Sequence, residues 1–116
     1  MPTTYSAIDP AVLLRLAGDR STFRVLSQTF IEHAPPLFSQ LVTALGRDDY
    51  GAVGRQSHAL KGMTMLVGAD RLTTLLQQLE TAARSQQRAE TGELDQLFGQ
   101  VLSEVIASVD DDGIDA

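Results

Sequence analysis

Apolar residues recur at intervals of three and four along most of this chain, and no segment of useful length alternates with a period of two. That spacing gathers apolar side chains on one face of an α-helix, whereas a half-buried strand requires strict alternation. The pattern therefore predicts an all-α fold with short connections. The economical architecture is an antiparallel up-down four-helix bundle with an extra short helix at its N-terminus.

Caps and prolines mark the first two helices. Asp9-Pro10 combines an N-cap with a proline at the first helical position, and Gly18 ends the short helix that follows. A second helix is expected to start near Asp19 or Ser21. Inside it, Pro35-Pro36 removes amide donors and disfavours helical geometry at the preceding residue, so we expect a kink or break there.

Three further helices are expected after the turn Gly46-Arg47-Asp48-Asp49, in which an aspartate is the cap. The first carries His58 and is closed by Gly68, the second runs from Ala69 to about Arg84, and the last begins near residue 94. Acidic residues at 110–112 disfavour a helix C-terminus, so the tail 110–116 is expected to fray.

Composition narrows the classes of protein to consider. The 116 residues, 43% of them hydrophobic, predict a single domain spanning 1–116. The chain has no cysteine, which rules out disulfides and thiolate zinc sites. A net charge of -6 with scattered Lys and Arg argues against nucleic acid, and short apolar runs argue against membrane insertion. The first five residues lack the features of a secretory signal. We expect a cytoplasmic monomer.

His58 lies on a helix whose core-facing positions are Val53, Leu60, Thr64 and Val67, with Ser57 between them. Leu60 is two positions after His58, a rotation of about 200°, so the imidazole is expected to face solvent if Leu60 points to the core. On the same exposed side are Gly51, Gly54, Arg55, Lys61, Gly62 and Met65. Glycine inside a helix costs roughly 0.5 to 1 kcal/mol relative to alanine, which favours a surface that another macromolecule approaches closely.

The antiparallel arrangement also predicts a neighbour for His58. His58 and Glu80 are each eleven residues from Ala69, so they come level across the turn. A carboxylate there would hold one ring nitrogen and leave the other as an exposed nucleophile. Lys61, one turn from His58, would offset negative charge on a phosphoryl group. His58, Lys61 and Glu80 are each common on helix surfaces. Only their combination indicates a functional site.

The string His58-Ala59-Leu60-Lys61-Gly62, followed by Gly68 and then Leu79-Glu80, resembles the histidine-containing phosphotransfer (HPt) domain of bacterial phosphorelays. The resemblance covers about residues 9–80 and, in outline, the last helix. It implies that His58 is the phosphoacceptor, that Lys61 neutralises the phosphoryl group, and that the acid at Glu80 orients the imidazole. Gly68 would permit the tight turn.

The resemblance also implies a docking surface around the histidine, for which we expect Leu13, Arg55, Ala59, Gly62 and Met65. Ser57 departs from the family pattern, in which alanine is common, and Met63 and Met65 stand where small residues are usual. Met63 is explained as core packing. Met65 is either a docking contact or an ordinary surface methionine.

The preferred hypothesis is a phosphorelay intermediate that takes a phosphoryl group from a receiver-domain aspartate and passes it to another response-regulator receiver. The domain itself needs no cofactor, because the receiver supplies Mg²⁺. A second reading is the phosphoacceptor domain of a chemotaxis-type or hybrid sensor histidine kinase. A third is a helical adaptor without phosphoryl transfer.

Other chemistries fit the sequence poorly. Ser57 and His58 are adjacent on a helix and diverge, so they cannot act as nucleophile and base. No glycine-rich nucleotide fingerprint is present, so the chain has no ATP-dependent kinase activity of its own. His33 lacks the companions of a metal site and is expected to be structural or idle.

Overall fold

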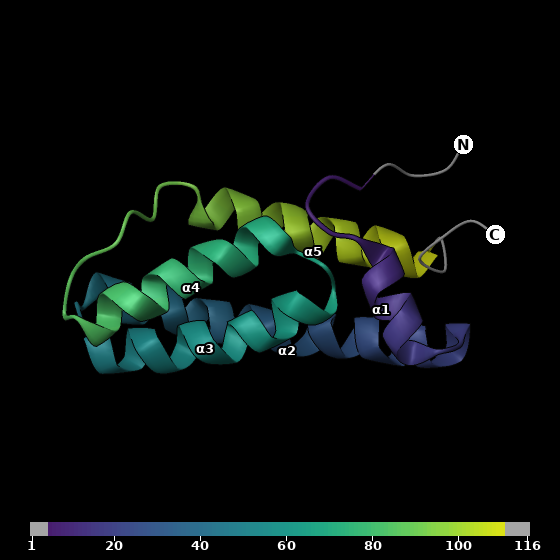
Figure 1. Ribbon diagram of the computed structural model, residues 1–116, viewed down its shortest axis with the longest axis horizontal. Helices are drawn as coiled ribbons and strands as arrows, with labels where there is room; N and C mark the ends of the chain where they lie inside the picture. The colour runs from purple at the N-terminus through teal and green to yellow at the C-terminus, as the bar shows by residue number, and fades with distance from the viewer. Residues whose placement is uncertain (1–4, 111–116) are drawn as a thin grey trace.

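The computed structural model describes residues 5–110, in which every regular element is an α-helix. The short α1 (Pro10–Ala17) precedes α2 (Arg20–Gly46), α3 (Tyr50–Leu66), α4 (Asp70–Arg84) and α5 (Leu94–Asp110). Helices α2 to α5 alternate in direction around one core, and α1 lies across one end of this bundle (Figure 1). The predicted all-α bundle with an additional N-terminal helix is therefore confirmed.

Side-chain caps set most helix starts where the sequence places them. Asp9, Asp19 and Asp49 each accept a hydrogen bond from an amide in the first turn of α1, α2 and α3. Gly18 follows α1 with φ 84°, in the left-handed conformation that favours glycine. Asp110 is the last residue of α5, and the rest of the acidic tail lies outside the described residues.

Helix α2 runs without a break through Pro35 and Pro36, so the break that the sequence allows there does not occur. Packing on both sides of the proline pair explains its continuity. Ala34 is fully buried, and Phe38 stacks on Phe98 of α5 with ring centroids 4.1 Å apart. These core contacts offset the two missing amide donors.

Two polar anchors fix the ends of the bundle. Glu104 of α5 accepts hydrogen bonds from the backbone amides of Ser6, Ala7 and Ile8, at 2.9, 2.9 and 3.4 Å. At the opposite end, Arg88 donates to both carboxylate oxygens of Asp48. Among residues 5–110, no helix combines the length and apolar character that a membrane span requires.

Candidate functional site

The inward face of α3 determines where His58 points. Val53, Ser57, Leu60 and Thr64 are buried, as the spacing predicts, and His58 lies on the opposite side with 70% of its side chain exposed. A hydroxyl contact of 2.8 Å between Thr64 and Thr73 joins α3 to α4 within the bundle. The histidine therefore projects from a helix held by its neighbours rather than from a loop.

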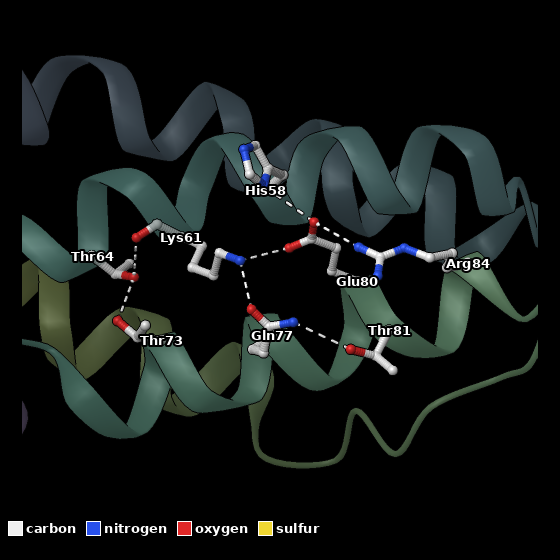
Figure 2. Close-up of polar contacts among 8 residues, drawn as sticks. All are labelled: His58, Lys61, Thr64, Thr73, Gln77, Glu80, Thr81 and Arg84. Atoms are coloured by element: carbon white, nitrogen blue, oxygen red, sulfur yellow. Dashed lines mark hydrogen bonds and ion pairs between the residues drawn. The ribbon is translucent and has the colours of Figure 1, made fainter.

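Glu80 of α4 meets His58 across the helix pair. Its Oε2 atom lies 3.1 Å from Nδ1 of the imidazole, which confirms the register expected from the α3–α4 turn (Figure 2). Because an ionised carboxylate only accepts hydrogen bonds, this contact assigns the ring proton to Nδ1. The other ring nitrogen, Nε2, points away from Glu80 (Figure 2). In the tautomer with its proton on Nδ1, the Nε2 lone pair faces solvent.

The cationic side chains of Lys61 and Arg84 also contact the Glu80 carboxylate. Lys61 Nζ lies 2.8 Å from Oε1, and Arg84 Nη2 lies 3.4 Å from Oε2. The hydrogen bond from Lys61 is the main cause that holds the pKa of Glu80 below its usual value; burial acts in the opposite direction, and the His58 contact adds to the lowering. Glu80 is thus ionised at neutral pH and available as an acceptor.

Lys61 lies on the exposed side of α3, yet its side chain is mostly covered and its ammonium group is hydrogen-bonded. Its ammonium also donates to Gln77 Oε1 at 2.6 Å, and only 17% of its side chain is exposed. In this arrangement Lys61 holds Glu80 rather than standing free beside the imidazole. Gln77 and Arg84 were missed from the sequence, although their spacing of three and four residues from Glu80 places them on the same face of α4.

The expected docking residues on α3 are open to solvent, whereas the one on α1 is not. Arg55, Ala59, Gly62 and Met65 are exposed, and a Cβ added at Gly62 would meet no atom within 4 Å. Leu13 is only 2% exposed because it packs into the core, so its assignment as a direct docking contact is corrected. The large exposed apolar side chain of α1 is Leu16.

Gly68 has the turn role that the resemblance implies and a second role that the sequence did not reveal. Its φ of +69° is left-handed, and it closes α3 just after the last helical residues. A Cβ there would lie 2.7 Å from the carbonyl oxygen of Asp9. The glycine therefore also lets the segment before α1 pack against the α3–α4 turn, where the Asp9 amide donates to the Val67 carbonyl.

The remaining singled-out residues lie outside this cluster. Met63 is half-buried and packs against the core, whereas Met65 is exposed. His33 is exposed on α2. Within the described range 5–110, no group of three or more His, Asp or Glu side chains is arranged to hold a metal ion.

Comparisons with known proteins agree with this geometry. The family model described as Hpt domain matches residues 25–111, which is most of the chain. The crystal structure of histidine-containing phosphotransfer protein B (HptB) from Pseudomonas aeruginosa PAO1 superposes with a TM-score of 0.67 at 25% identity, covering 91% of this chain and 90% of that one. No curated protein matches the sequence. The chain belongs to the Hpt family, the histidine-containing phosphotransfer domains of phosphorelays.

Proposed function

We propose that this domain is a phosphorelay intermediate that accepts a phosphoryl group on Nε2 of His58 from a receiver-domain aspartate and passes it to another receiver. The observation that carries the proposal is the exposed imidazole whose Nδ1 is held by Glu80. A nucleophile of this kind needs exposure, a fixed tautomer and a fixed ring orientation.

The transfer can be written from the atoms of the site. The Nε2 lone pair attacks phosphorus, a P–N bond forms, and the P–O bond to the receiver aspartate breaks, so the carboxylate leaves. The ring gains positive charge while Nδ1 keeps its proton, and the Glu80 carboxylate at 3.1 Å stabilises that charge. The reverse sequence delivers the group to the second receiver.

Lys61 contributes through Glu80 in this proposal. Its ammonium keeps the carboxylate ionised and in place, and it adds positive charge one turn from the phosphorylated ring. Mg²⁺ belongs to the receiver, which also supplies most of the catalysis. The receiver docks over Arg55, Ala59, Gly62 and Met65 of α3, with Leu16 taking the place first given to Leu13.

The test is incubation of purified protein with a panel of phosphorylated receiver domains, with wild type and His58→Gln side by side. We expect acid-labile, base-stable label on the wild type and none on the variant, with both proteins equally folded by circular dichroism. Absence of label on wild type across a broad panel would contradict the relay and favour a kinase-tethered phosphoacceptor or an adaptor. Label on His58→Gln would place the phosphoacceptor elsewhere.

A further inference from the structure

A cleft of about 490 Å³ opens beside His58 and lies between α3 and α4. His58 and Glu80 line one end, and Tyr50, at the start of α3, lines the other. Its floor is built from small residues, Gly51 and Gly54 of α3 and Ala83 of α4. A Cβ at position 54 would make an ordinary contact of 3.8 Å with the Ala83 methyl group. Because Gly54 lines the cleft, we expect a longer side chain there to fill part of it.

Two guanidinium groups line this cleft although the chain carries a net charge of -6. Arg55 is exposed and has no hydrogen bond or ion pair with any residue in the range 5–110. Arg84 is 72% exposed, and its contact with Glu80 is a long one of 3.4 Å. Arg55 is therefore free to bind an anion, and Arg84 can turn to one by giving up its single long contact with Glu80. Arginine binds carboxylates through paired, directed hydrogen bonds.

Small residues lie beside the two arginines of this cleft. The Arg55 guanidinium lies close to Gly51, since a Cβ at position 51 would touch Arg55 Nη1 at 3.4 Å. Because His58 and the two arginines line the same cleft, a macromolecule bound over the imidazole lies within reach of both guanidinium groups. Charge complementarity therefore selects a partner surface that carries carboxylates at this position.

We propose that the cleft receives an acidic segment of the receiver domain that exchanges phosphoryl groups with His58, and that Arg55 and Arg84 bind its carboxylates. This inference rests on the proposed function and names the chemistry of the partner at that same site. Partners that present no acid to the cleft would be disfavoured, so the two arginines contribute to partner selection.

The first test compares Arg55→Glu with Arg71→Glu, using the receiver that transfers fastest in the panel. Arg71 is a matched control because it is also an exposed arginine of α4, where it pairs with Glu93. It lies at the N-terminal end of the helix, whereas Arg84 lies at the C-terminal end. Each rate is divided by the rate at which phosphoramidate phosphorylates the same variant, which removes differences in His58 reactivity. We expect Arg55→Glu to lower kcat/KM about tenfold at low salt, through KM, and the difference to shrink as salt rises.

The second test fills the cleft by shape instead of charge. Gly54→Leu is compared with Gly99→Leu, which alters an exposed glycine of α5 that has no atom within 4 Å of an added Cβ. We expect only Gly54→Leu to raise KM for the receiver. Equal kinetics of Arg55→Glu and wild type at low salt, or a loss confined to kcat, would overturn the acidic-partner inference while leaving the relay in place. Failure of every receiver to phosphorylate wild type would overturn both.

Discussion

Glu80 and Glu104 are two carboxylates with a pKa below the usual value, and they organise two different regions. Glu80 binds the side chains of His58, Lys61 and Arg84 on the exposed side of the α3–α4 pair. Glu104 instead binds three consecutive backbone amides ahead of α1. A carboxylate bound to side chains orients groups that remain free to react, whereas one bound to amides fixes the path of the chain.

The physical causes of the two pKa shifts also differ between the two regions. For Glu80 the largest effect is the Lys61 hydrogen bond, so the shift depends on a side chain that can move. For Glu104 burial raises the pKa, but hydrogen bonds from Ala7, Gln100 and Ser6 together lower it below the usual value. The first region is therefore suited to chemistry and the second to attachment of the N-terminal segment.

The largest effect on stability is expected at Gly68, where the α3–α4 turn packs against the segment before α1. Gly68→Ala should lower the free energy of unfolding by about 3 kcal/mol, because the left-handed backbone disfavours a side chain and the new Cβ would meet Asp9 backbone atoms. Chemical denaturation measures this loss, with Gly99→Ala as the control in an open helical position. A loss as small as that of the control would show that Asp9 moves aside readily.

Removal of the N-terminal anchor comes next. Glu104→Ala should destabilise the fold by about 2 kcal/mol, since it removes charge-assisted hydrogen bonds to three amides. The lowered pKa means that the wild-type contribution is present above the unfolded pKa of about 4.5 and is lost as pH falls through the lower folded value. The unfolding free energy of the variant should therefore depend less on pH in the acid range. Glu93→Ala, at an exposed ion pair, is the control.

Glu80→Ala should change chemistry more than stability. Loss of the Nδ1 contact is expected to slow phosphoryl transfer about tenfold, or about 1.4 kcal/mol in activation free energy. Nitrogen chemical shifts of the imidazole provide a second readout, because the variant should populate both neutral tautomers while wild type holds its proton on Nδ1. Unchanged shifts and an unchanged rate would remove Glu80 from the orienting role.

The smallest effect is expected for Ser57→Ala, a change on the buried face of the helix that carries His58. The Ser57 hydroxyl is fully buried, and its oxygen has no hydrogen-bond partner among the described residues. Replacing it with a methyl group should stabilise the fold by about 1 kcal/mol and leave the transfer rate unchanged. Destabilisation by Ser57→Ala, measured by denaturation, would indicate that a buried water satisfies this hydroxyl.

Features that follow from helix geometry were predictable from the sequence. The 100° step between residues placed His58 opposite Leu60, and equal distance from the turn placed Glu80 beside it. Capping by Asp9, Asp19 and Asp49 is likewise local. These predictions needed only the spacing of residues within one helix or across one short turn.

Features that depend on contacts between distant segments were not predictable in this way. The local preference of Pro35-Pro36 to interrupt a helix is overridden by packing such as the Phe38–Phe98 stack. Leu13 was assigned to the surface because α1 alone does not reveal which of its leucines faces the bundle. Capture of residues 6–8 by Glu104 joins segments nearly a hundred residues apart, and no local pattern marks it.

The single exposed face around His58 has a kinetic consequence for the proposed relay. Donor and acceptor must occupy the same patch of α3 in turn, because one imidazole cannot serve two receivers at once. The rate of relay then depends on how quickly the first receiver leaves and on whether phosphorylated His58 survives until the second receiver arrives. Tight binding by either receiver would slow the flow of signal, so the relay operates best with partners of modest affinity and short residence time.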